Sequence, residues 1–300
     1  MSDTRQGDNG PTTRRLPPWL KRPLPAGAGY ADVERLLKQG CLNTVCRSAR
    51  CPNLGECWSR RVATFMILGN VCTRNCRFCA VQKGPVEPLD PNEPGRVAEA
   101  ARKMGLKHVV VTSVTRDDLP DEGAAHFAAT IRALRAALPH STVEVLVPDF
   151  HARPELLEIV CREKPDVFNH NVETVEALAP IIRPMADYRR SLTVLAMVAR
   201  TYPDPIVKSG LMVGLGETET QVRQTLRDMA QTGCRVVTVG QYLAPSDRHH
   251  PVEHFYEPAW FEALTHWAAA YLPDLIVYAA PFVRSSYLAE KLFGQLRKQP

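Results

Sequence analysis

Short apolar runs, rich in β-branched residues, recur along the chain after residue 61, and each predicts a strand. The runs are almost continuously apolar instead of alternating with polar positions, which is typical of strands buried on both faces of a sheet. They cover residues 62–68, 108–113, 142–147, 166–171, 206–214 and 235–240, with a further candidate at 275–280.

Stretches with the spacing of amphipathic helices separate these runs, at residues 94–105, 124–138, 154–163, 187–200 and 217–233. Gly105 and Gly233 end two of them, as glycine commonly does at a helix C-terminus. Regular alternation of strand and helix predicts an α/β fold with a parallel sheet covered by helices. Six units fit either a doubly wound sheet or an incomplete (β/α) barrel, and periodicity does not distinguish the two.

The two ends of the chain depart from this pattern. The first 29 residues hold five prolines and little periodicity, which predicts a flexible arm. A short amphipathic helix is expected at 31–39, whereas 40–61 has no helix or strand pattern. We therefore divide the chain into an arm (1–29), an extension (30–61), a core (62–241) and a C-terminal segment (242–300) with a final helix expected near 286–297.

The composition, with 45% hydrophobic and 23% charged residues, is ordinary for a globular protein. No apolar run is long enough to span a bilayer, and the N-terminus lacks the apolar segment of a secretory signal, so we expect a cytoplasmic protein and no membrane partner. The small net charge of +5 makes nucleic-acid binding an unfavoured function. Arg116, Asp117 and Asp118 form a charged triplet that we expect to be solvated.

Cysteine usage is the first sign of chemistry. Six of the nine cysteines lie between Cys46 and Cys79. Disulfides are disfavoured in a reducing compartment, so this clustering indicates metal or redox chemistry. The remaining three, Cys41, Cys161 and Cys234, have no partner at ligand spacing, and Cys161 and Cys234 are expected to serve in packing.

Cys72, Cys76 and Cys79 have the spacing Cys-x3-Cys-x2-Cys and follow the first predicted strand. Parallel α/β folds place their sites at the carboxyl ends of strands. Three thiolates can hold three irons of a [4Fe–4S] cluster and leave the fourth iron open to substrate. Structural zinc takes four ligands, usually from two cysteine pairs, and no second pair lies at the usual spacing. Cluster ligation is therefore favoured over zinc and over chance packing.

Cys46, Cys51 and Cys57 form a second set, spaced Cys-x4-Cys-x5-Cys, upstream of the first strand. Taken alone, this spacing also fits a zinc loop or a redox-active trio. Two sets of three cysteines, each one ligand short, favour two iron–sulfur clusters.

The Cys-x3-Cys-x2-Cys spacing, with Phe78 before the last cysteine, resembles the radical S-adenosylmethionine superfamily. That resemblance implies a cluster whose open iron chelates S-adenosylmethionine and which, on reduction, cleaves it to a 5′-deoxyadenosyl radical. The wider pattern resembles the lipoyl synthase family through CPNLGEC, ATFMILG, VVVTSVTRDDL, VEVLVPDF, FNHNVETV, KSGLMVGLGET, VGQYLAPS and FVRSSY, which span about residues 42–290. It implies an incomplete (β/α)6 barrel of the TIM type, with an N-terminal cluster-binding extension and a C-terminal helical segment.

The family resemblance also implies the ligands of the second, auxiliary cluster. In lipoyl synthases these are the three upstream cysteines and a serine of the C-terminal Arg-Ser-Ser-Tyr segment. Here they correspond to Cys46, Cys51, Cys57 and Ser286, with Ser285 as the alternative serine. A serine oxygen is a hard iron ligand that is easier to displace than a thiolate, which suits a cluster that gives up its sulfur. Without the resemblance the two serines would be interpreted as a helix N-cap.

Residues at the ends of other strands are candidates for binding S-adenosylmethionine. Polar side chains could bind the methionine amino group or the ribose hydroxyls, and glycines let the backbone approach a ligand closely. Capping of loops and helices is an equally open interpretation of the polar ones. The candidates are Thr112 and Ser113 for the amino group, Asn171 and Glu173 for the ribose, and Gly214 and Gly216 for the adenine side.

The resemblance implies insertion of two sulfur atoms at C6 and C8 of an octanoyl chain in lipoate biosynthesis. Such C–H bonds are too inert for acid–base chemistry, so a radical-generating cofactor is required. The implied partners are an octanoylated carrier (an E2 lipoyl domain or glycine cleavage H protein), a ferredoxin- or flavodoxin-type reductant and an iron–sulfur carrier for cluster repair.

Two alternatives remain open. The first is another sulfur-inserting radical enzyme, such as a biotin synthase or a methylthiotransferase. A biotin synthase would hold its auxiliary cluster inside the barrel, whereas this chain has the second cysteine set before the first strand. The second alternative is a non-catalytic iron–sulfur or zinc protein, which a metal count would distinguish.

Overall fold

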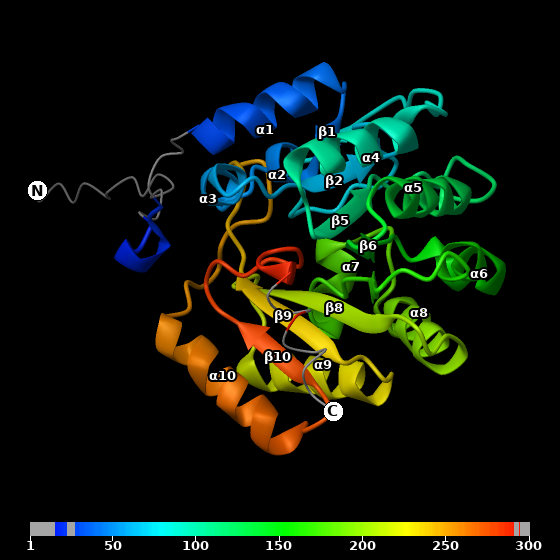
Figure 1. Cartoon of the computed structure of the whole chain (residues 1–300). Helices are drawn as coiled ribbons and strands as arrows, with labels where there is room; N and C mark the ends of the chain where they lie inside the picture. Colours follow the sequence, from blue (N-terminus) through cyan, green and yellow to red (C-terminus); the bar gives the residue numbers. More distant parts are fainter. Residues whose placement is uncertain (1–15, 23–27, 291–293, 295–300) are drawn as a thin grey trace, which may run out of the picture.

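The computed structural model describes residues 16–22, 28–290 and 294, and its centre is a curved, mainly parallel sheet (Figure 1). Within these residues the strand order is β1-β2-β5-β6-β7-β8-β9-β10. The sheet runs from the antiparallel edge strand β1 to the parallel edge strand β10, and these two edges do not pair in the part of the chain described. The strands are β1 (Asn43–Thr44), β2 (Thr64–Ile67), β5 (His108–Ser113), β6 (Thr142–Leu146), β7 (Val167–Asn169), β8 (Ile206–Val213), β9 (Val236–Gln241) and β10 (Ile276–Ala279).

Helices follow the central strands and lie along the outside of the curved sheet (Figure 1). The unit of strand plus helix occurs six times, from β2 to β9, so the expected incomplete (β/α)6 barrel is confirmed over the doubly wound alternative. The covering helices are α4 (Glu93–Met104), α5 (Ala124–Ala137), α6 (Pro154–Cys161), α8 (Tyr188–Thr201), α9 (Glu219–Gln231) and α10 (Pro258–Tyr271). Helix α1 (Ala28–Gln39) packs against α4, and the one-turn helix α7 (Ala179–Ile182) accepts the Arg77 N–H at the Ile182 carbonyl.

The expectation of an irregular segment at 40–61 is wrong. This segment contains β1, α2 (Val45–Ser48) and α3 (Leu54–Ser59). The Thr44 hydroxyl caps α2 by accepting from the Arg47 N–H at 3.3 Å, and Trp58 of α3 is fully buried against Tyr30 of α1. Helices of one turn or slightly more are too short for a 3.6-residue period to be visible in sequence.

Some predictions lie outside the described residues. The final helix expected at 286–297 falls largely on residues that are not described, and so does most of the arm at 1–29. Of the arm, Pro18–Leu20 forms a 3₁₀ turn with Leu20 buried. In the part of the chain described, no helix combines the length and the apolar character needed to cross a membrane.

The chain leaves β2 through Leu68, whose backbone is held on both sides. Leu68 has a left-handed φ of 69°, its N–H donates to Glu93 Oε2 at 2.8 Å, and its carbonyl accepts from Arg116 Nη1 at 3.3 Å. His126 Nε2 lies 2.8 Å from the same Glu93 oxygen, and both side chains are buried. These contacts set the direction in which the chain enters the loop that carries Cys72.

The expectation that the charged triplet is solvated is therefore wrong for Arg116. Its side chain is buried, with one face bound to the Leu68 carbonyl and the other to Asp118. The guanidinium supplies several donors in a planar fork, so it can satisfy a backbone carbonyl and a carboxylate together. This role could not be predicted from the sequence, because Arg116 and Leu68 are 48 residues apart.

We expect Glu93→Ala to lower the free energy of unfolding by about 1–3 kcal/mol, because the Leu68 N–H and His126 would lose their buried acceptor. Glu99→Ala, on the exposed face of the same helix, serves as the control and should leave that free energy nearly unchanged. Chemical denaturation of the apoproteins measures both. Equal stabilities of the two variants would contradict a structural role for the Leu68 contact.

Candidate functional site

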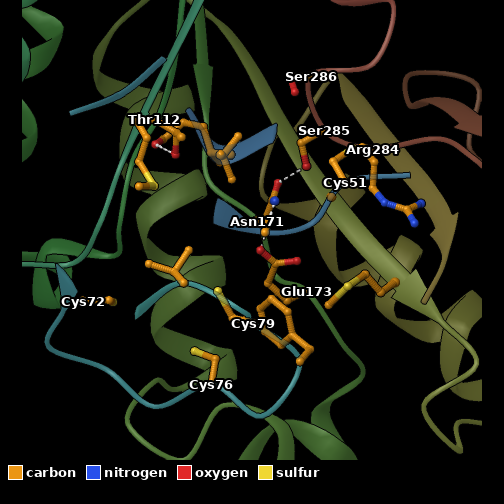
Figure 2. A pocket seen from close by; sticks show the side chains of 18 of the residues that line it. Cys51, Cys72, Cys76, Cys79, Thr112, Asn171, Glu173, Arg284, Ser285 and Ser286 are labelled. Carbon is orange, nitrogen blue, oxygen red and sulfur yellow. Dashed lines mark hydrogen bonds between the residues drawn. The ribbon is translucent and has the colours of Figure 1, made fainter. Parts of the chain in front are cut away.

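A cavity of about 340 Å³ opens at the carboxyl ends of the barrel strands. Its wall combines elements far apart in sequence: the loop after β2, the ends of β5 to β9, the extension and the C-terminal segment (Figure 2). Parallel strands bring their carboxyl ends to one edge, so residues that follow different strands meet there. Most of the chemically reactive candidates lie on this wall: Cys46, Cys51, Cys72, Cys76, Cys79, Thr112, Ser113, Asn171, Glu173, Ser285 and Ser286.

The strand-end cysteines lie together on one side of the cavity (Figure 2). Cys72 ends the short strand β3 (Val71–Cys72), which pairs with β4 (Gln82–Lys83), and its sulfur accepts the Thr115 N–H at 3.4 Å. Burial first, and then the charges of Cys76 and Cys72, raise the pKa of the Cys79 thiol to about 12. The three thiols are therefore close enough to repel one another as thiolates.

The upstream cysteines form a second, separate group. Cys46 lies in α2 and Cys57 in α3, and the Cys51 N–H donates to the Cys46 carbonyl at 2.9 Å. Burial is the largest cause that raises the pKa of the Cys57 thiol to about 12, and the charges of Cys46 and Cys51 are the next largest. Since the charges of Cys46 and Cys51 affect Cys57, the three cysteines form one group, although Cys57 does not line the cavity.

The C-terminal segment is fastened to the extension directly beside this group. Asn53, which precedes α3, donates from Nδ2 to the Phe282 carbonyl at 2.7 Å, and the Tyr287 hydroxyl donates to Glu56 at 3.0 Å. These two contacts join residues more than 200 positions apart in sequence. They bring Ser285 and Ser286 to the side of the cavity on which Cys51 lies (Figure 2).

The two cysteine sets fit iron–sulfur clusters. Iron binds thiolates, and a buried group of thiols with raised pKa values gains most from a cation that stabilises the deprotonated form. Burial raises the pKa of two thiols in each set, Cys46 and Cys57 upstream and Cys76 and Cys79 at the strand end. The two serines lie on the side of the cavity with Cys51 (Figure 2). The donor sets thus match one cluster with an open iron and one with an oxygen ligand available.

The candidates for S-adenosylmethionine binding are placed unequally. Asn171 and Glu173 face the cavity, and Ser113 has a buried hydroxyl with no hydrogen-bond partner among the described residues. Thr112 donates its hydroxyl to the Leu146 carbonyl at 2.9 Å, so that donor is already engaged. Gly214 and Gly216 follow the end of β8 with φ of 99° and 110°, and they do not line the cavity. Gly210, within β8, does line it.

His170 is a residue that sequence analysis missed. Its Nδ1 lies 2.9 Å from the Val147 carbonyl, so Nδ1 carries the proton and Nε2 is an acceptor. Burial first, and then the charge of Arg183, lower the pKa of His170 to about 4. Nε2 is buried and has no partner within the described residues, although His170 lines the cavity. A ligand with a hydrogen-bond donor fits here. The position of His170 between two polar residues at the end of a strand, Asn169 and Asn171, was the sequence signal that could have identified it.

Arg74 anchors the cysteine loop through a buried ion-pair network that sequence analysis also missed. Its Nη2 lies 2.8 Å from both Asp117 and Asp149, and Asp149 also accepts from Arg190 at 2.8 Å. Burial alone would raise the pKa of Asp149, but the hydrogen bonds and charge of Arg74 hold it well below its usual range. The arginine is the second residue after Cys72, so this network fixes the loop between Cys72 and Cys76.

The expected packing role of Cys161 and Cys234 is confirmed. Cys161 and Cys234 are buried in the core, whereas Cys41 is exposed. All nine cysteines have free thiols.

Comparisons with known families support the same chemistry. A model of the radical SAM superfamily matches residues 66–229. A model of the N-terminal domain of lipoyl synthase of the radical SAM family matches residues 2–51.

Curated relatives match over almost the full chain. A lipoyl synthase of Nitratidesulfovibrio vulgaris (strain DP4) is 53% identical over 296 residues, which cover 98% of each chain. A lipoyl synthase of Caldanaerobacter subterraneus subsp. tengcongensis is 54% identical over 278 residues, covering 93% of this chain and 97% of the relative.

Solved structures support the fold alone. The chain is similar to methylornithine synthase with a TM-score of 0.55 and 15% identity, covering 83% of this chain and 74% of that one. It is also similar to HydG, a maturase of the [FeFe]-hydrogenase, with a TM-score of 0.57 and 15% identity, covering 83% and 63%.

We expect Asp149→Ala to lower the free energy of unfolding by about 3 kcal/mol and to reduce the iron retained, because the buried Arg74 would lose a carboxylate partner. The control is Asp204→Ala, which removes a solvent-exposed partner of Lys164 and should retain the wild-type iron content. Iron analysis after anaerobic reconstitution and chemical denaturation measure the two effects. Wild-type iron retention in Asp149→Ala would contradict the anchoring role.

Proposed function

The chain belongs to the lipoyl synthase family of the radical S-adenosylmethionine superfamily, and on that basis we propose how its residues divide the family's reaction. The reaction inserts two sulfur atoms at C6 and C8 of an octanoyl chain carried by a protein, with S-adenosylmethionine and two [4Fe–4S] clusters as cofactors. When bound, these cofactors supply the 5′-deoxyadenosyl radical that removes hydrogen and the sulfur that replaces it.

We propose that Cys72, Cys76 and Cys79 hold the cluster that binds S-adenosylmethionine. Three thiolates leave one iron open, which is the requirement for chelating the amino and carboxylate groups of that cofactor. Arg74 keeps the loop between Cys72 and Cys76 in place through Asp117 and Asp149.

The remaining contacts to S-adenosylmethionine are proposed from the polar atoms of the wall. Asn171 and Glu173 would hold the ribose hydroxyls, and Ser113 the methionine amino group, with Thr112 shaping the wall beside it. The backbone at Gly214 and Gly216, in a conformation that favours glycine, would follow the adenine side.

We propose that Cys46, Cys51, Cys57 and Ser286 hold the auxiliary cluster, which provides the sulfur. The observation behind this division is that two separate three-thiol groups adjoin one cavity, with two serines beside the upstream group. Radical source and sulfur source would then lie on opposite sides of a single substrate site. Between them the wall offers apolar side chains suited to an octanoyl chain, among them Val81, Met212, Leu243 and Val283.

The division of the chain follows from this arrangement. Residues 30–61 would form the auxiliary cluster-binding extension and 62–241 the radical core, while 242–300 would supply the serine. The arm at 1–29 is proposed to be flexible.

The carrier, which presents the octanoyl chain, is proposed to be an E2 lipoyl domain or the glycine cleavage H protein. A ferredoxin or flavodoxin would supply electrons, and an iron–sulfur carrier would rebuild the auxiliary cluster. A reducing compartment, the cytoplasm, suits nine free thiols.

Removal of one cluster at a time tests the division of labour. Cys51→Ala should still release 5′-deoxyadenosine, because its radical-cluster ligands are intact, but should form no thiolated product. Cys76→Ala should form neither, and each variant should retain about four of the eight irons. Anaerobic incubation with S-adenosylmethionine, dithionite and an octanoyl-lysine peptide, followed by mass spectrometry, measures both products.

The results can contradict the assignment in three ways. Sulfur insertion by soluble Cys51→Ala would exclude the donor role of the upstream set. Loss of both products in a folded Cys51→Ala would make the upstream set a structural support. Zinc without visible absorbance in the wild type would exclude radical chemistry altogether.

Ser286→Ala should reduce lipoyl product by about tenfold or more, because the auxiliary cluster would keep only three protein ligands. Ser285→Ala is the matched neighbour and should stay within about fivefold of the wild type, since it removes a hydrogen bond and no ligand. Product formation and iron content are measured for both. If Ser285→Ala lost the cluster and Ser286→Ala did not, the ligand would be Ser285; full turnover in both variants would exclude a required serine ligand.

A further inference from the structure

A chain of hydrogen bonds joins the C-terminal segment to the residues proposed to hold the ribose. The Ser285 hydroxyl donates to Asn171 Oδ1 at 2.9 Å, and Asn171 Nδ2 donates to Glu173 Oε1 at 3.0 Å (Figure 2). Ser285 lies 114 positions from Asn171 in sequence. The contact therefore connects the wall that carries Ser286 with the wall that faces the strand-end cysteines.

The Glu173 end of this chain is held by the sheet. The Glu173 N–H donates to the Gly210 carbonyl, and the Met212 N–H donates to the Glu173 carbonyl, both at 2.9 Å. A β-carbon on Gly210 would lie 2.6 Å from Ser285 Oγ and 2.7 Å from Asn171 Oδ1. Since such distances are too short for a real contact, glycine at this position is what lets the serine and the asparagine meet.

The Ser285 end is one residue from the proposed iron ligand. The Tyr287 N–H donates to the Arg284 carbonyl at 2.9 Å, so Ser285 and Ser286 are the central residues of a turn. Fixing one central residue of a four-residue turn restricts the backbone of the other. The hydrogen bond to Asn171 therefore restricts where the Ser286 hydroxyl can lie.

We propose that Ser285 is a positioning residue that couples occupancy of the S-adenosylmethionine site at Asn171 and Glu173 to the placement of Ser286 at the upstream cysteines. This inference rests on the proposed function. The Asn171 amide donates from Nδ2 to Glu173 and accepts at Oδ1 from Ser285. A ligand that orients the Glu173 carboxylate therefore also orients this amide, and so strengthens the hydrogen bond from Ser285. The sulfur donor is thereby completed when the radical source is loaded, which limits radical formation without sulfur in reach.

Hydrogen exchange on the reconstituted holoprotein tests the coupling without turnover. We expect S-adenosylmethionine, added without reductant, to slow exchange in residues 281–290 of the wild type by about fivefold. In Ser285→Ala this protection should disappear, while the protein retains the wild-type iron content. By reciprocity, the affinity for S-adenosylmethionine should fall by the same factor. In an Asn171→Ala background, Ser285→Ala should have no further effect on that affinity.

Ser141→Ala is the matched control. Its hydroxyl, which is buried where that of Ser285 is partly buried, donates to the Leu106 carbonyl at 2.6 Å, near the opposite end of the strands. This variant should keep the full ligand-dependent protection of 281–290. A merely structural loss of one buried hydrogen bond would move both serine variants alike.

The outcomes separate the coupling from the proposed function. Full ligand-dependent protection in Ser285→Ala would overturn the coupling. Loss of about four irons in that variant would make Ser285 the ligand itself and would also overturn it. If the wild type bound S-adenosylmethionine and showed protection but released no 5′-deoxyadenosine on reduction, the proposed function would fail while the coupling stood.

Discussion

The organisation of the site depends on contacts across the open side of the barrel. The edge strands β1 and β10 do not pair in the described chain, so the sheet alone does not bring the extension and the C-terminal segment together. The hydrogen bonds from Asn53 to Phe282 and from Tyr287 to Glu56 do so. Asn53 is almost fully buried, and an amide in that environment is costly without its partner. The open side of the barrel thus leaves room for the upstream cysteines beside the strand-end cysteines.

The strand-end site depends on buried charge in a different way. Leu68 turns the chain out of β2 with both of its backbone polar groups held by charged side chains. Arg74 then holds the cysteine loop against Asp117 and Asp149. Buried ion pairs contribute little net stability but fix geometry, because breaking one leaves an uncompensated charge. The ion pairs of Arg74 therefore orient the loop without any contribution from a metal.

The thiols themselves are in an environment that disfavours their reactive form. Burial and mutual repulsion raise the pKa values of Cys57 and Cys79, so without a metal these groups keep their protons. Metal binding must then release protons and gains its affinity partly by relieving that repulsion. The hydrogen bond from Ser285 to Asn171 adds a link between the C-terminal segment and the wall that faces the strand-end cysteines.

The sequence by itself determined the fold class and the chemistry. Continuous apolar runs alternating with helical stretches predicted the parallel sheet, and the spacing of Cys72, Cys76 and Cys79 indicated the cluster, because both signals are local. The family pattern, not periodicity, selected the partial barrel. What sequence could not give were relations between distant residues: the burial of Arg116, the anchoring of Arg74 by Asp149, the acceptor nitrogen of His170, and the approach of Ser285 to Asn171. Hydrogen bonds and ion pairs of this kind depend on where the strands end in space. The curvature of the sheet and the contacts across its open edge determine those positions, and neither can be read from local sequence.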